Sequence, residues 1–324
     1  MASTGTRTSS TTGSTEGITQ TTTYLLAGDI GGTNSRLRLY ASAHDQSDPL
    51  VDKDYRNQVA LTDKNAGAFE RLILHPFLEH CSTKLKSKGL TPIDESEIIA
   101  VLACAGPVKK NEATLTNLGI TIDGNAIESN LHCQHQGTHA STVKRALIIN
   151  DFVAQGYGCL TLDSTEIMEL TPGSLEMIDP TGPKVCVGAG TGLGECFLTP
   201  NGSGYTCFPS EGGHVEYNPR SSLEIDLRSF LMAETESDTR ISVERVVSGT
   251  GLANVYRFLS TECPDLVDKV DKKIHDDFLS AGDQQGRVVS EGAKAGNEIC
   301  AMAMDIMIRY VFVQIERKLR CVLS

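Results

Sequence analysis

The chain has 324 residues, a mass of 34.8 kDa and a formal net charge of −12; 40% of its residues are hydrophobic and 22% are charged. These values are typical of a globular protein that is large enough for two domains. An acidic chain is poorly suited to nucleic acid or anionic membranes, and no apolar run reaches the roughly 18 residues of a membrane span. We therefore expect no nucleic-acid or membrane partner. The ten cysteines are scattered, which favours reduced thiols in a cytoplasmic protein over a disulfide framework.

Residues 1–23 are rich in Ser, Thr and Gly and contain almost no apolar side chains. Such a segment buries too little surface to offset the entropy lost on ordering, so we expect a disordered tail. An organelle transit peptide is the alternative, because the stretch is rich in hydroxyl groups and poor in acids. It has only one arginine, Arg7, and no amphipathic pattern, which favours the tail.

The first glycine-rich segment joins two predicted strands. Its residues are Gly28, Asp29, Ile30, Gly31, Gly32, Thr33 and Asn34. The paired glycines allow a positive φ and a close approach of the backbone to a ligand, and successive N–H groups in such a turn bind an anion. Asp29 suits a phosphate only with a cation between them, and Mg²⁺ is the usual one. We predict a β-hairpin that holds the phosphates of a metal-bound nucleotide; the alternative is a plain hairpin turn.

The hydrophobic pattern next predicts a helix over residues 66–85 and buried strands over 97–105 and 146–150. Asp151 follows the last of these strands, a position that often carries function in α/β proteins. A carboxylate there can accept the proton of a hydroxyl that attacks a phosphoryl group; the alternative is a cap for the next helix. A cluster in the polar loop before that strand lacks a second cysteine pair, so we expect no metal site at His132, Cys133, His135 and His139.

The second glycine-rich segment, residues 188–194, lies between strands predicted over 184–188 and 195–199. Four glycines and Thr191 make the same kind of anion-binding turn as the first segment. Two such hairpins suggest that a polyphosphate is held from two sides. Beyond residue 220 the pattern predicts mainly helices, over 223–234, 243–259 and 288–315.

A carboxylate and an imidazole, Glu211 and His214, are separated by two glycines. Both side chains can hydrogen-bond a small polyol, and the glycines let the backbone approach it. Glu244 lies near the start of a predicted helix. Without a ligand, the first two are surface residues and Glu244 is a solvated helix acid or a capping-box partner.

Together these motifs resemble the bacterial-type glucokinases, which share the hexokinase and actin-like ATPase fold. The matching segments follow the family's order between residue 24 and about residue 307, at 28–34, 105–107, 116–117, 149–152, 188–194, 211–215 and 243–249. The resemblance implies a two-domain α/β, ribonuclease H-like protein, with a small domain over 24–150 and a large domain over 151–324. It also implies transfer of the γ-phosphoryl group of ATP, with Mg²⁺, to the 6-hydroxyl of glucose in glycolysis.

The resemblance assigns roles by position. Asp151 is expected to be the general base. The expected sugar-binding residues are Asn117, Asn150, Asp151, Glu211, His214 and Glu244. The expected nucleotide-binding residues are Gly28, Asp29, Gly31, Gly32, Thr33, Asn34, Gly190, Thr191 and Gly192, with Asp29 organising Mg²⁺ through water. A homodimer is also implied.

The sequence departs from the family pattern near its end. In the family, a helix such as 291–309 leads to a further strand and a second glycine turn that contacts the nucleotide, and residues 310–324 contain no such turn. We therefore expect an incomplete C-terminal part and an exposed sheet edge, with weak ATP binding, low stability or both. The alternatives to an active glucokinase are a catalytically weak or inactive glucose-binding protein and a kinase for another hexose.

Overall fold

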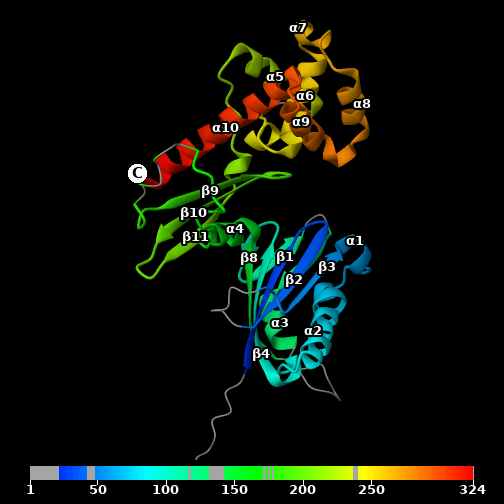
Figure 1. Ribbon diagram of the computed structural model, residues 1–324, viewed down its shortest axis with the longest axis vertical. Coiled ribbons are helices and arrows are strands. Elements are labelled where there is room, and N and C mark those ends of the chain that lie inside the picture. The colour runs from blue at the N-terminus through cyan, green and yellow to red at the C-terminus, as the bar shows by residue number, and fades with distance from the viewer. Residues whose placement is uncertain are drawn as a thin grey trace, which may run out of the picture. The chain divides into compact units, whose positions relative to one another are not determined.

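The computed structural model describes residues 22–41, 48–115, 118–130, 142–170, 173, 176, 179–235 and 240–323. The chain divides into two compact units, Met1–Ile149 (unit 1) and Asn150–Ser324 (unit 2), which carry separate hydrophobic cores (Figure 1). Asn117 and the cluster at residues 132–139 lie outside the described residues.

Unit 1 is built on a five-stranded sheet with the order β3-β2-β1-β4-β8. Its strands are β1 (Thr22–Ile30), β2 (Asn34–Tyr40), β3 (Val51–Arg56), β4 (Ser96–Cys104) and β8 (Thr142–Asn150). β1 pairs antiparallel with β2 and parallel with β4. Along β2, buried Leu37 and Leu39 alternate with exposed Arg36 and Arg38, the pattern of a strand with one covered face.

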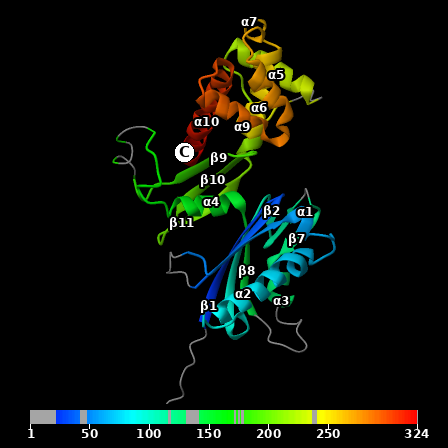
Figure 2. The ribbon, with the colours of Figure 1, turned by 45° about the vertical axis from the view of Figure 1, so that its right-hand side comes forward.

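Helices cover that apolar face, and α2 lies along it in Figures 1 and 2. The helical elements are α1 (Asn57–Ala60), the π-helical turn η1 (Glu70–Leu74), α2 (His75–Ser87), the 3₁₀ turn η2 (Ile93–Glu95) and α3 (Gly124–Asn130). The single helix predicted over 66–85 is therefore η1 followed by α2. Pro76 directly follows the π-helical turn, and because Leu74 and His75 are already helical, its missing N–H removes one hydrogen bond from a continuous helix. A small second sheet contains β5 (Val108–Lys109), β6 (Glu112–Leu115) and β7 (Ile120–Asp123).

Unit 2 begins with α4 (Asp151–Cys159) and a three-stranded antiparallel sheet with the order β11-β10-β9. Its strands are β9 (Lys184–Ala189), β10 (Leu193–Pro200) and β11 (Tyr205–Ser210). α4 contacts all three strands, and α10 (Glu298–Leu323) contacts β9 from the other side (Figure 1).

After β11, the regular elements described in unit 2 are helices and 3₁₀ turns. Besides α10, they are the 3₁₀ turn η4 (Gly212–His214), α5 (Ser222–Glu234), the 3₁₀ turn η5 (Val243–Arg245), α6 (Gly249–Thr261), α7 (Pro264–Val267), α8 (Lys272–Ser280), the 3₁₀ turn η6 (Gly282–Gln284) and α9 (Gln285–Lys294). Two predictions are corrected. The helix over 243–259 is η5 followed by α6, because Ser248 is extended and caps α6. The helix over 288–315 is divided between α9 and α10, because Gly296 has a φ of 86°. In the described part of the chain, no helix combines the length and apolar character needed to span a membrane.

Candidate active site

The first glycine-rich segment forms a β-hairpin between β1 and β2, with residues 31–33 as its turn. The Gly31 N–H donates to the Asn34 carbonyl at 2.9 Å, which closes the turn. Gly31 does not use the positive φ that a glycine allows, because its φ lies outside the left-handed region. Gly28 lies on β1, where a Cβ would come within 2.6 Å of the Leu102 side chain, so this glycine packs closely against the core of unit 1.

Asn57 supports the hairpin turn through hydrogen bonds to two of its carbonyl groups. Its side-chain Nδ2 donates to the Gly31 carbonyl at 2.7 Å, and its backbone N–H donates to the Thr33 carbonyl at 2.8 Å. Its Oδ1 accepts from the Ser35 hydroxyl at 2.7 Å, and both side chains are fully buried. Buried polar groups that satisfy one another fix a unique geometry, so Asn57 and Ser35 set the shape of the turn.

Asp29, the predicted metal-binding residue, stands opposite Arg36 in the β1–β2 pairing. Arg36 Nη1 lies 3.2 Å from Asp29 Oδ2, and the Asp29 side chain is 59% exposed. An exposed carboxylate is the donor chemistry that Mg²⁺ prefers. The Asp29 carboxylate could therefore hold Mg²⁺ through bound water. Arg36 is a neighbouring cation that competes with the ion for one oxygen of this carboxylate.

The predicted general base lies at the first position of α4. Asn150, and not Asp151, is the N-cap: its Oδ1 accepts from the backbone N–H groups of Phe152 and Val153 at 3.0 and 3.2 Å. The Asn150 Nδ2 donates to Asp151 Oδ1 at 2.9 Å. The cap residue thus also orients the carboxylate of its neighbour.

Phe152 ties this helix start to the second glycine-rich segment. A Cβ at Gly194 would come within 1.7 Å of the Phe152 ring, and one at Gly188 within 2.8 Å. Gly188 and Gly194 face each other in the β9–β10 pairing, so the ring lies against both strands. These two glycines are needed for packing, and through Phe152 they fix Asp151 relative to the turn at residues 190–192.

The turn at residues 190–192 is held by hydrogen bonds from η5 and α6. The Gly249 N–H donates to the Gly190 carbonyl at 2.7 Å, and Glu244 Oε2 accepts from the Leu193 N–H at 2.8 Å. A Cβ at Gly192 would come within 2.5 Å of the same Glu244 oxygen. Glu244 therefore supports the turn, a role that differs from both the solvated acid and the capping-box partner that the sequence offered.

Glu211 immediately precedes the turn η4, and His214 is the last residue of that turn. Glu211 Oε2 lies 3.8 Å from His214 Nε2, and the two side chains are 70% and 59% exposed. Gly213 between them packs against β10, since a Cβ there would come within 2.2 Å of the Leu193 carbonyl. Through the contacts of Phe152, Gly213 and Glu244, several predicted site residues of unit 2 lie near the turn that joins β9 to β10. They are Asn150, Asp151, Gly190, Thr191, Gly192, Glu211, His214 and Glu244.

Some supporting residues were missed from the sequence. Asn57 gives no local signal, because it lies 26 residues from the carbonyl that it binds. Phe152 looks like any core aromatic residue. Ser248 did carry a signal, a serine followed by a helical pattern: its hydroxyl accepts from the Gly251 N–H and donates to the Glu244 carbonyl, both at 2.8 Å.

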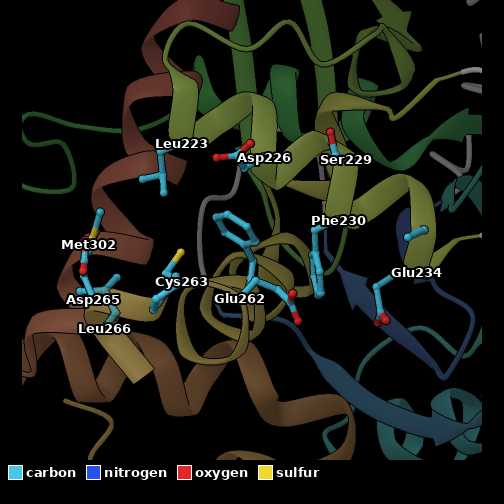
Figure 3. Close-up of a pocket in the computed structure, with 13 residues that line it drawn as sticks. Leu223, Asp226, Ser229, Phe230, Glu234, Glu262, Cys263, Asp265, Leu266 and Met302 are labelled. Atoms are coloured by element: carbon cyan, nitrogen blue, oxygen red, sulfur yellow. The ribbon is translucent and has the colours of Figure 1, made fainter. Parts of the chain in front are cut away.

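A separate cavity of about 780 Å³ lies among α5, α6, α7 and α10 (Figure 3). Apolar side chains such as Leu223, Phe230 and Met302 line it. It also carries four carboxylates, those of Asp226, Glu234, Glu262 and Asp265. No predicted site residue lines this cavity, and its negative charge disfavours a polyphosphate.

Comparison with known proteins supports the sequence motifs. The family model described as glucokinase matches residues 26–312. A glucokinase of Nostoc punctiforme is 36% identical over 249 residues, which cover 75% of this chain and 64% of the relative. A glucokinase of Synechocystis is 33% identical over 293 residues, covering 87% of this chain and 76% of the relative. The chain therefore spans just under two thirds of the first relative's length and about three quarters of the second's.

Solved structures share the fold at lower identity. Glucokinase from Balamuthia mandrillaris in complex with glucose has a TM-score of 0.60 at 19% identity, over 90% of this chain and 74% of that one. A ROK family glucokinase from Streptomyces griseus in complex with glucose and AMPPNP has a TM-score of 0.51 at 15% identity, over 92% and 80%. The mixed α/β architecture is thus that of glucokinases of the actin-like ATPase fold. By its family match and the identity with its relatives, the chain belongs to the glucokinase family.

Proposed function

We propose that this chain transfers the γ-phosphoryl group of ATP to the 6-hydroxyl of glucose, giving glucose 6-phosphate and ADP. One observation carries the proposal: Asp151 and Glu244 are both held beside the turn at residues 190–192. Phe152, next to Asp151, packs on Gly188 and Gly194, and Glu244 accepts a hydrogen bond from the Leu193 N–H. A base and an anion-binding turn held at fixed separation are what an in-line phosphoryl transfer requires. Family membership, and the glucose and AMPPNP of the related structures, support the choice of substrates.

In this proposal, Asp151 accepts the proton of the 6-hydroxyl as its oxygen attacks the γ-phosphorus. Asn150 orients that carboxylate, and Glu211, His214, Asn117 and the second carboxylate oxygen of Glu244 bind sugar hydroxyls. The turns at residues 31–34 and 190–192 present backbone N–H groups to the phosphates. The N-terminus of α6 at Gly249 lies against the second turn, and its partial positive charge favours an anion there. Mg²⁺, held through water by Asp29, would neutralise phosphate charge.

The test is a coupled assay of glucose 6-phosphate formation by the full chain with ATP, Mg²⁺ and glucose, compared with the Asp151→Asn variant. Loss of a general base lowers kcat by about 10²- to 10⁴-fold, while glucose binding measured by calorimetry should stay within about twofold. Asp163→Asn is the matched control, because Asp163 is an exposed aspartate that only caps a local turn at Thr165. If Asp151→Asn turns over at the wild-type rate, Asp151 is not the base. Glucose binding without ATP binding or turnover would instead identify a sugar-binding protein.

A homodimer and a cytoplasmic location complete the proposal. Sedimentation velocity of the purified chain and microscopy of a tagged copy test these two points.

A further inference from the structure

Two cysteine sulfurs lie in contact at the end of α4. The Sγ of Cys159, the last residue of α4, is 3.8 Å from the Sγ of Cys186 on β9. Cys159 is exposed and Cys186 is half-buried. A disulfide has an S–S length of about 2.05 Å, so the pair needs to close by roughly 2 Å to form one.

Two further cysteines lie beside the pair. Cys186 is directly opposite Cys196 in the β9–β10 pairing, and the two thiols are hydrogen-bonded. A Cβ at Gly156 would come within 2.6 Å of Cys196 Sγ and 2.7 Å of Cys207 Sγ, so this glycine lets α4 lie directly on the cysteines. The described ranges contain no group of three or more His, Cys, Asp or Glu side chains placed to hold a metal ion.

We propose that Cys159 and Cys186 are a site of reversible disulfide formation that ties the end of α4 to β9. The oxidant is a small disulfide of the glutathione class. The thiolate of Cys159, the more exposed sulfur, attacks one oxidant sulfur and releases one small thiol. The thiolate of Cys186 then attacks the Cys159 sulfur of the mixed disulfide and releases the second. Two protein thiols lose two protons and two electrons, and the oxidant gains them as two thiols.

The chemistry of the two thiols sets the speed of this exchange. Burial and the neighbouring Cys186 raise the pKa of Cys159. The hydrogen bond with Cys196, together with burial, raises the pKa of Cys186. A raised thiol pKa means that less thiolate is present at neutral pH. The disulfide should therefore form slowly near pH 7 and several-fold faster per pH unit as the pH rises above it.

The position of the pair gives the bond a consequence. α4 begins at Asp151, and β9 leads after Ala189 into the turn at residues 190–192. A covalent link between α4 and β9 restrains the two elements that carry these groups. The disulfide itself does not depend on the proposed kinase activity, so it can be tested without a turnover assay.

The test equilibrates the full chain with mixtures of oxidised and reduced glutathione at about pH 8, alkylates free thiols and digests with trypsin. Cleavage after Arg145, Lys184 and Arg220 places Cys159 in fragment 146–184 and Cys186 in fragment 185–220. We expect these two fragments to be linked in oxidising mixtures and to separate on reduction, with fragment-ion sequencing assigning the bond to Cys186.

Two variants and a second measurement complete the design. Cys159→Ser should abolish the link, and Cys263→Ser, which removes a half-buried thiol elsewhere in unit 2, should retain it. Hydrogen exchange of the α4 amides should slow in the oxidised wild type and stay unchanged in Cys159→Ser. Absence of the link at the most oxidising ratio, or a bond assigned to Cys196 or Cys207 instead, would overturn the proposal.

Discussion

Single buried side chains fix the geometry of the first glycine-rich turn. Asn57 and Ser35 form one hydrogen-bonded pair beneath it, and Asn57 also binds the carbonyls of Gly31 and Thr33. Each satisfied hydrogen bond adds about 1 kcal/mol, but a buried group left without its partner costs about 1–3 kcal/mol. The conformation of the turn is therefore set more by the hydrogen bonds of Asn57 than by Gly31 and Gly32.

Asn57→Ala should weaken both the fold and nucleotide binding. The substitution removes the hydrogen-bond partner of the Ser35 hydroxyl and of the Gly31 carbonyl. We therefore expect a loss of about 2–4 kcal/mol in the free energy of unfolding. We also expect a several-fold rise in KM for ATP with KM for glucose unchanged. Ser82→Ala, which removes a hydrogen bond to Asp94 elsewhere in unit 1, is the control for stability loss alone. Equal KM values for ATP in wild type and Asn57→Ala would contradict the assigned role.

Glu70 is a buried carboxyl whose charge opposes folding. It is 6% exposed, and Oε2 has no hydrogen-bond partner among the described residues. Burial raises the pKa of Glu70 above its usual value of 4.5, and the charge of Asp123 adds to this. Because the folded-state pKa is raised, the folded chain binds more protons, and the contribution of Glu70 to stability falls as pH rises through 4.5 toward the folded pKa.

Glu70→Gln should therefore raise Tm at pH 7 and have little effect near pH 4. Thermal unfolding across this pH range measures the difference, with exposed Glu79→Gln on α2 as a control for the same change in charge. A stabilisation by Glu70→Gln that is equal at pH 4 and pH 7 would show that the ionised carboxylate is not the cause.

At the scale of elements, the β9–β10 hairpin and α6 act as one assembly. Ser248 caps α6 by accepting from the Gly251 N–H and also donates to the Glu244 carbonyl. Glu244 in turn binds the Leu193 N–H beside the turn at residues 190–192. A helix cap and the turn at residues 190–192 are thus connected through Glu244.

Ser248→Ala should separate cap loss from turn support. Removing an N-cap costs about 0.5–2 kcal/mol, and here it also frees Glu244, so KM for ATP should rise. Ser221→Ala is the matched control, because Ser221 caps α5 through the Glu224 N–H without touching the turn. Ser248→Ala should lose at least as much stability as Ser221→Ala, and steady-state kinetics should show a raised KM for ATP in Ser248→Ala alone. The idea fails if the two variants have the same KM.

The sequence predicted elements well where one local signal was sufficient. The strands around both glycine-rich segments and the start of α4 follow from apolar runs bounded by glycine or polar residues. The prediction failed where a backbone change inside an apolar pattern ended a helix, as at Gly296 and Ser248. In the candidate site, the residues that we propose to carry the chemistry were named from the motifs. Their supports could not be named in this way, since Asn57 and Phe152 act on residues distant in the chain.

At the scale of the molecule, the two units have separate buried cores. Phe77 lies in the core of unit 1 and Leu227 in that of unit 2, and both are fully buried. Proteins with independent cores commonly depart from two-state unfolding, because each core can melt by itself. Calorimetry should therefore resolve two components for this chain.

Two core variants assign these components. Phe77→Ala removes about 3–5 kcal/mol and Leu227→Ala about 2–5 kcal/mol, since each leaves a cavity that relaxes only partly. Phe77→Ala should lower the midpoint of one component and Leu227→Ala that of the other. Leu279→Ala, which alters a side chain that is 63% exposed, should shift neither. A single transition that both core variants lower equally would mean that the two cores unfold together, so that the units are coupled more strongly than their separate packing implies.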